Sequence, residues 1–214
     1  MPHLLKKTLI ALAACAVVVA ACYFYVDRPV AFYVHSHHLN KIHAFELLTL
    51  PPPLVQDWSP LVIAMLVIWR VYSPLPHFAR MVLVASLSLI VADQFRESCG
   101  NLCDRDWPET WHDDNPSLIA SGAYGFHPLK FEKDAGSFPS GHATRILAFL
   151  TVFWIGAPRG RLLYVAVAAP MLASLVLMNY HFVSDVVAGS TLGGIVGAYA
   201  AWLGGLSGDR SQRD

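Results

Sequence analysis

At Phe138–His142, with the sequence FPSGH, a polar segment of the chain gives way to a long apolar run. The same change occurs at His181–Asp185, with the sequence HFVSD. If the chain crosses a bilayer, both junctions lie on the same side of the membrane. Two histidines and one carboxylate are then expected beside a helix that begins with small residues.

The composition indicates a membrane protein. The chain has 214 residues, of which 55% are hydrophobic and 14% are charged, whereas soluble domains carry about 25% charged residues. The mean hydropathy is +0.46. The formal net charge is zero, so nothing in the composition indicates a nucleic acid as partner. The expected partner is the lipid bilayer.

Six apolar runs are long enough, or nearly so, to cross about 30 Å of hydrocarbon, which takes about 20 helical residues. The second and third runs are short, so we expect the second to begin near Leu54 and the third within Pro74–His77. The runs are Thr8–Tyr25, Ser59–Tyr72, Arg80–Phe95, His142–Ala157, Leu162–Asn179 and Ser184–Leu203.

The distribution of basic residues predicts the orientation. Lys and Arg concentrate in short cytoplasmic segments, and the short segments Arg70–Arg80 and Pro158–Arg161 are dense in Arg. Both termini are therefore expected in the cytoplasm. The first apolar run, preceded by Lys6 and Lys7, is expected to be a signal anchor. A cleaved signal peptide is the alternative, and it leaves the remaining topology unchanged.

The chain is expected to form a single domain over residues 1–214, with its long segments outside. One of these is Val26–Trp58. The other, Arg96–Ser140, is rich in Pro, Gly, aromatic and acidic residues, which predicts a turn-rich cap. Its Trp residues equally fit an interfacial aromatic belt. Glycines in the last apolar run predict close helix packing. These are Gly189, Gly193, Gly194 and Gly197.

The segment Ser140–His142 is a candidate phosphate site. A helix that begins after Pro139 leaves its first N–H groups unpaired, and these groups and the helix dipole attract anions. Gly141 permits close approach of the backbone, Ser140 adds a hydroxyl, and His142 can donate a proton. A simple N-cap followed by an interfacial histidine is the alternative reading of these residues alone.

His181 and Asp185 are candidate catalytic residues. Their spacing of four places them on one face of a helix. The carboxylate is then expected to bond one ring nitrogen and to raise the basicity of the other, as a nucleophilic histidine requires. A capping Asp and an interfacial His are the alternative, but such groups are costly at an apolar helix end without a role.

Together, the two motifs resemble the second and third signature motifs of the type 2 phosphatidic acid phosphatase (PAP2) family, which shares its fold with vanadium haloperoxidases. The resemblance implies an all-α, six-helix transmembrane bundle. It implies that His181 attacks phosphorus and forms a phosphohistidine, that Asp185 orients it, and that His142 protonates the leaving group. Ser140 and Gly141 are then phosphate ligands, and no metal or cofactor is required.

The chain departs from the family's pattern at two cationic positions. The third motif usually has Arg where Leu175 stands, and the Lys of the first motif falls on Gly100. Phosphate needs cationic partners. Arg145, three residues after His142 on the same helix face, is the predicted replacement, and Arg105 is also assigned to phosphate binding. The further candidates are Arg96, Lys130 and Lys133.

Two weaker patterns lie in the outer segments. Cys99 and Cys103 are expected outside the membrane, where a disulfide between them is one outcome and free thiols are the other. The first outer segment holds a group of histidines, which is expected to be an interfacial polar loop rather than a metal site. These are His35, His37, His38 and His43.

The sequence therefore predicts a metal-independent phosphatase that acts on a membrane lipid phosphate or diphosphate at the outer face of a bacterial inner membrane. A lipid phosphotransferase with the same site is one alternative. A non-catalytic lipid-binding or transport protein with a degenerate site is another. Phosphatidic acid, phosphatidylglycerol phosphate, polyprenyl diphosphate and lipid A all remain candidate substrates, and the sequence does not indicate an oligomeric state.

Overall fold

The structure is a computed structural model that describes residues 2–111, 115–129 and 136–206. Within these residues the regular secondary structure is helical, and no β-strand is formed. Two isolated bridges, Arg105 with Phe126 and Trp107 with Ser117, are the β-type pairs recorded in the described residues. The predicted sites Lys130 and Lys133 lie outside the described residues.

Most helices follow one another along the chain with short connections, and the longer ones run from Cys103 to Leu118 and from Ser121 to Gly141. Two 3-10 turns, η1 (Leu39–Lys41) and η2 (Pro158–Gly160), lie between them. The α-helices are α1 (Pro2–Tyr25), α2 (Asp27–Ser36), α3 (His43–Thr49), α4 (Pro51–Tyr72), α5 (His77–Cys103), α6 (Leu118–Ser121), α7 (Gly141–Gly156), α8 (Arg161–Leu177) and α9 (Val183–Leu203).

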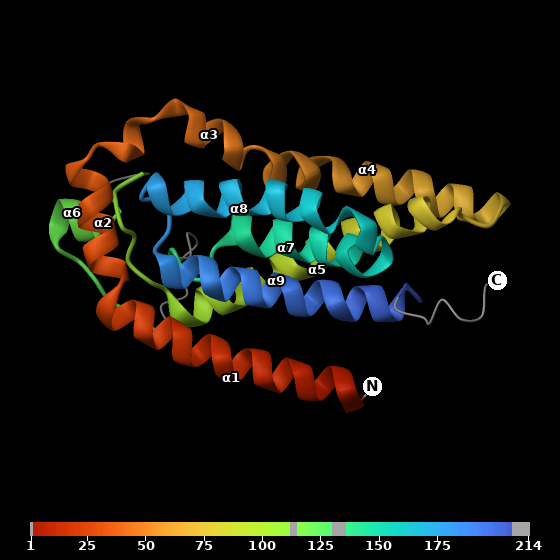
Figure 1. Cartoon of the computed structure of the whole chain (residues 1–214), viewed down its shortest axis with the longest axis horizontal. Helices are drawn as coiled ribbons and strands as arrows, with labels where there is room; N and C mark the ends of the chain where they lie inside the picture. Colours follow the sequence, from red (N-terminus) through yellow and green to blue (C-terminus); the bar gives the residue numbers. More distant parts are fainter. Residues whose placement is uncertain (1, 112–114, 130–135, 207–214) are drawn as a thin grey trace.

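The long helices run side by side along the longest axis of the molecule (Figure 1). Helix α1 begins and α9 ends at the same end of the bundle, whereas α2, α6 and the start of α9 lie at the opposite end. Successive long helices therefore alternate in direction. The two junctions singled out in the sequence, before α7 and before α9, consequently lie at one end.

Among the described residues, five helical segments are long and apolar enough to cross a membrane: Pro2–Tyr25, His43–Tyr72, His77–Cys103, Pro158–Leu177 and Val183–Leu203. Helix α7 is apolar but has only 16 residues. Their exposed apolar side chains face outward from a small core, as expected where lipid replaces water. The chain is thus a multi-pass membrane protein. Each of the six predicted runs corresponds to one of these segments, although the fourth run extends beyond the end of α7 to Ala157 and the fifth beyond the end of α8 to Asn179.

The predicted helix limits need two corrections. The second run begins before Ser59, as expected, but at Pro51 rather than near Leu54, because proline is well tolerated in the first turn of a helix and Pro51 and Pro52 open α4. The third run begins at His77, as expected, but continues to Cys103. The predicted outer loop that was to begin at Arg96 is therefore helical through Cys103.

Helices α7 and α9 pack closely because glycines line their contact. A Cβ added at Gly189, Gly193 or Gly197 would overlap backbone carbonyl oxygens of α7 or of Ser140 just before it. Gly194 points elsewhere, since its added Cβ meets nothing closer than 4.0 Å. The predicted role of the glycines is confirmed for three of the four positions.

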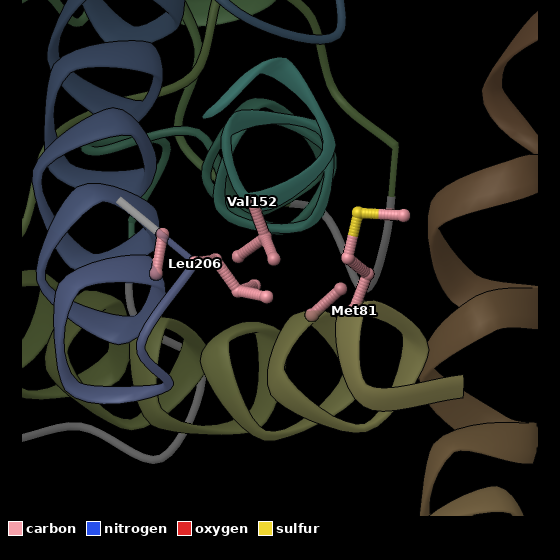
Figure 2. Close-up of a cluster of buried hydrophobic side chains, with 5 residues drawn as sticks. Met81, Val152 and Leu206 are labelled. Atoms are coloured by element: carbon pink, nitrogen blue, oxygen red, sulfur yellow. The ribbon is translucent and has the colours of Figure 1, made fainter. Parts of the chain in front are cut away.

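An apolar cluster closes the end of the bundle away from the two junctions. It joins α5, α7 and α9 through Met81, Ala85, Val152, Ala201 and Leu206, and Figure 2 shows Met81, Val152 and Leu206 gathered between the three helices. This cluster and the glycine contact hold the same three helices together. The start of α7 is therefore fixed relative to the start of α9.

We expect Gly193→Ala to destabilise the protein by about 1–3 kcal/mol, because the added methyl forces the α7–α9 backbones apart. Gly194→Ala is the matched control and should be neutral or slightly stabilising, since alanine favours helix. Thermal unfolding in detergent measures the difference. Equal midpoints for the two variants would contradict the assigned contact.

Candidate active site

A hydrogen bond joins the two motifs directly. The N–H of Ser140, which caps α7, donates to the carbonyl oxygen of Asp185 in the first turn of α9 at 3.0 Å. Both helices start at the same end of the bundle, as Figure 1 shows. The prediction that the two motifs meet is therefore realised in the fold, and the residues between them form one site.

His181 is buried, with 3% of its surface exposed. Its Nδ1 lies 3.0 Å from the carbonyl oxygen of Ser137. A carbonyl oxygen only accepts, so Nδ1 carries the proton and Nε2 is left with a free lone pair. This is the tautomer that a nucleophilic histidine needs.

The expected hydrogen bond between Asp185 and this ring is not formed. The Oδ2 of Asp185 lies 3.8 Å from Nδ1, which is too long for a hydrogen bond. The ring is oriented by the backbone of Ser137, and Asp185 acts on it through its nearby charge. Burial lowers the pKa of His181 below its ordinary value, and Asp185 offsets part of that shift. The imidazole is thus neutral at neutral pH.

The rings of His142 and His181 both lie beside one aromatic ring. The ring of Tyr180 is 5.6 Å from that of His142 and 5.1 Å from that of His181, edge to face in both cases. Trp107 lies 5.4 Å from His181, and Trp111 lies 5.5 Å from Tyr180. The two tryptophans therefore line the site rather than only a lipid interface.

The first turn of α7 offers donors to an anion. In the described part of the chain, no acceptor is found for the N–H groups of Gly141 and His142. Ser140 is buried and its Oγ accepts from the N–H of Ala143 at 3.4 Å. Ser140 was predicted to bind phosphate, but its hydroxyl caps α7 and its N–H bonds Asp185. Gly141 and His142 supply the free donors instead.

Two guanidinium groups lie against Gly141. A Cβ added there would be 3.4 Å from Nε of Arg96 and 3.7 Å from Nη1 of Arg145. Burial raises the pKa of Tyr180, although the positive charges of the same two arginines oppose the shift. The phenol therefore stays protonated beside them. The predicted Arg145 is thus at the site, and Arg96, a lesser candidate in the sequence, is beside it.

The two arginines have different partners. Arg145 donates from Nε to Oδ1 of Asp93 at 2.9 Å, and its Nη2 is also 2.9 Å from that oxygen. Gln56 donates to the other oxygen of Asp93 at 2.8 Å. Arg96 donates from Nε to the carbonyl oxygen of Pro139 at 3.3 Å and forms no salt bridge with a described carboxylate. Its charge therefore remains available to an anion.

Arg105 was predicted to bind phosphate, and the structure places it elsewhere. It is 1% exposed. Its Nη1 donates to Oδ1 of Asp185 at 2.5 Å and its Nη2 to Oδ2 of Asp27 at 2.9 Å. Two buried carboxylates attract this guanidinium more strongly than an open site does. Arg105 thus holds Asp185 from behind the site.

The other sequence patterns do not add to the site. Leu175, at the position where the family carries Arg, packs in an apolar cluster with Met171 and Val186. Cys99 and Cys103 are free thiols, so no disulfide joins them. The histidines of the first outer segment form no potential metal-binding group in the described residues.

Sequence reasoning missed Ser137, Asp27, Asp93 and Tyr180. Only Asp27 and Asp93 carried a signal, since a carboxylate at or inside an apolar helix is costly unless it is paired. Ser137 acts through its backbone, which no residue type reveals. Tyr180 stands next to His181 but has no spacing that marks it.

Comparisons with known proteins identify a matching family and similar phosphatases. A model of the PAP2 superfamily matches residues 81–207. A lipid A 1-phosphatase of Rhizobium etli is 34% identical over 87 residues, which cover 41% of this chain and 34% of that protein. A decaprenylphosphoryl-5-phosphoribose phosphatase of Mycobacterium tuberculosis is 41% identical over 69 residues, which cover 32% and 38%. The chain spans about a third of the length of these curated relatives.

A solved structure shares the fold. The PAP2-type phosphatidylglycerolphosphate phosphatase from Bacillus subtilis aligns over 96% of this chain and 99% of its own, with a TM-score of 0.58 and 15% sequence identity. The match confirms the prediction of an all-α transmembrane bundle. At this identity the likeness concerns the fold alone.

We expect inorganic phosphate to bind at the start of α7 and to raise the thermal midpoint of the protein, as any ligand of the folded state does. Arg96→Gln should reduce the rise, because the uncompensated cation is lost. Arg159→Gln, at an exposed arginine at the other end of the bundle, is the control and should behave as wild type. Equal rises in both variants would place the anion elsewhere.

Proposed function

The chain belongs to the PAP2 superfamily, and we propose that it hydrolyses a membrane lipid phosphate through a phosphohistidine formed on His181. The observation that carries the proposal is the hydrogen bond from Nδ1 of His181 to Ser137. It leaves Nε2 as a free nucleophile beside two arginines and the unpaired N–H groups of α7. Lipid phosphatases among the similar proteins support the same activity.

The first step is transfer of the phosphoryl group to the enzyme. The Nε2 lone pair of His181 attacks phosphorus, and the bond from phosphorus to the lipid oxygen breaks. His142 gives its proton to the departing oxygen. Arg96, Arg145 and the N–H groups of Gly141 and His142 stabilise the charge on the phosphoryl oxygens.

The second step releases the phosphate. His142, now neutral, takes a proton from water as the water oxygen attacks phosphorus, and the phosphorus–nitrogen bond breaks. Inorganic phosphate leaves, and His181 and His142 return to their starting states. While the phosphoryl group is on Nε2, the ring of His181 carries positive charge. The carboxylate of Asp185, 3.8 Å from Nδ1, offsets that charge.

The cation missing at Leu175 is replaced within the site. Leu175 is on α8 and packs in the apolar cluster, whereas Arg96 comes from α5 and Arg145 from α7. Both guanidinium groups lie against Gly141. The phosphate in our proposal thus keeps two cationic partners, and the altered motif does not make the site degenerate.

The site is proposed to face the outside of a bacterial inner membrane. Lys6 and Lys7 are in α1 near its start, Arg159 lies in η2 between α7 and α8, and Arg161 begins α8. These positions are at the end of the bundle opposite the two histidines, as Figure 1 shows for the helices concerned. By the preference of basic residues for the cytoplasm, both termini are inside and the site is outside.

We expect purified protein in detergent to release phosphate from at least one member of a lipid panel and His181→Asn to release none. The panel comprises phosphatidic acid, phosphatidylglycerol phosphate, polyprenyl diphosphate, lipid A and decaprenylphosphoryl-5-phosphoribose. Release should continue in EDTA, since no metal takes part in either step, and labelled phosphate should be trapped on His181 of the wild type.

The same assay separates the alternatives. Phosphate transfer that requires a second lipid as acceptor would identify a phosphotransferase instead. Neither release nor labelling with any substrate would identify a non-catalytic protein. His77→Asn, which changes an exposed histidine beside Gly156 at the far end of α7 from His142, is the control and should retain the wild-type rate.

We expect the loss caused by His142→Asn to depend on the leaving group. A lipid alkoxide needs a proton to depart, so lipid hydrolysis should fall by about 100-fold or more. An aryl phosphate such as p-nitrophenyl phosphate departs without one, so it should still phosphorylate His181. Labelled enzyme should then accumulate, because the base for the second step is missing. An equal loss for both substrates would remove His142 from the role of acid.

A further inference from the structure

A buried group of charges lies behind His181. Arg105 bridges Asp27 and Asp185, and its Nη1 also donates to Oγ of Ser184 at 2.6 Å. The N–H of Ser184 donates to Oδ1 of Asp27 at 3.0 Å, and its hydroxyl donates to the other oxygen. Asp27 thus holds Arg105 and the first turn of α9 together.

The surroundings of this group are apolar. The guanidinium carbon of Arg105 lies 4.2 to 5.4 Å from the centres of four aromatic rings, those of Tyr23, Tyr124, Phe126 and Phe182. Asp27 and Asp185 are 1% and 0% exposed. Water therefore screens these charges little, and each one acts strongly on its neighbours.

The group carries one positive and two negative side chains. If Arg105 were paired with Asp185 alone, the pair would be neutral. The electrostatic attraction between Asp185 and a charged His181 ring would then be weak. The second carboxylate, Asp27, shares the guanidinium and leaves the group with an excess negative charge. Burying an extra charge is costly, so a compensating positive charge is expected nearby. The start of α9 and the phosphorylated ring of His181 supply it.

We propose that Asp27 is a positioning residue for the reaction at His181: it fixes Arg105 and the start of α9, and it keeps the buried group negative toward the phosphorylated ring. This inference rests on the proposed function. It extends the site to α2, which lies outside residues 81–207 that match the family model. Asp27 acts through Arg105 and Asp185 and does not touch the substrate.

The proposal predicts how the pH profile moves. The charged groups near His181 are Asp185 of α9, Arg105 and Asp27 behind it, and Arg96 of α5. The titratable group nearby is His142 of α7, which Arg145 also faces. His181 reacts only when neutral, so its protonation sets the acid limb of kcat/KM. Removing a negative charge from the buried group favours the neutral ring. The acid limb of Asp27→Asn should therefore move to lower pH.

The test compares Asp27→Asn with wild type in the phosphate-release assay. Asparagine keeps one acceptor oxygen, which can still receive the N–H of Ser184, and it loses the acceptor for Arg105. Gel filtration and thermal unfolding check that the variant is folded. We expect kcat to fall by about tenfold or more because stabilisation of the charged ring is lost, KM to change little, and the acid limb to shift downward. Asp57→Asn, at an exposed residue of α4, is the matched control and should leave all three unchanged.

Arg105→Lys separates charge from geometry. Lysine keeps the charge but cannot bond both carboxylates in the fixed fork of a guanidinium. We expect kcat to fall while the acid limb stays in place, with Arg28→Lys, the exposed neighbour of Asp27, as control. If Asp27→Asn does not fold, this variant carries the test, and an unchanged kcat overturns the proposal.

The outcomes separate the two hypotheses. A wild type that never labels His181 overturns the proposed function and this inference with it. An active wild type with unchanged kcat in folded Asp27→Asn overturns the role of Asp27 alone. A fall in kcat with an unmoved acid limb in Asp27→Asn also overturns it, because a purely structural defect acts in that way.

Discussion

The close approach of α7 and α9 is the constraint on which the rest of the structure depends. Glycines on α9 bring its backbone against the carbonyl oxygens of Thr144 and Ala148. With the helices at this distance, Ser140 at the start of α7 reaches Asp185 at the start of α9 through a backbone hydrogen bond. A larger residue in the contact would separate the two histidines that the proposed reaction needs together.

The fold distributes its cations between two environments. Arg105 is enclosed by aromatic rings and is bound by two carboxylates. Its positive charge is therefore compensated inside the protein and is not available to a substrate. Arg96 and Arg145 lie against the first turn of α7. Arg145 forms a salt bridge with Asp93, whereas Arg96 donates only to a backbone carbonyl oxygen in the described structure. A guanidinium in an apolar helix without a carboxylate is costly, and in the proposed reaction an anionic phosphate offsets that cost.

Chemical roles in this site are shared between side chains and backbone. Ser137 fixes the tautomer of His181 with its carbonyl oxygen, a part that the sequence assigned to Asp185. The carboxylate then contributes through its charge alone, at 3.8 Å. Ser140 likewise acts as a helix cap. Such assignments follow from the direction in which each group points, and spacing along the chain does not reveal direction.

The sequence by itself determined the membrane class, the approximate spans and the two motifs that supply His142, His181 and Asp185. These are local properties, since the length of an apolar run and the spacing of residues on a helix are visible in the chain. Only the tertiary structure decided that Arg105 is buried, that Arg96 stands with Arg145, and that Asp27 belongs behind the site. Asp27 and Arg105 are far from Asp185 in sequence, and only the tertiary packing of α2, α9 and the segment after α5 brings their charges together.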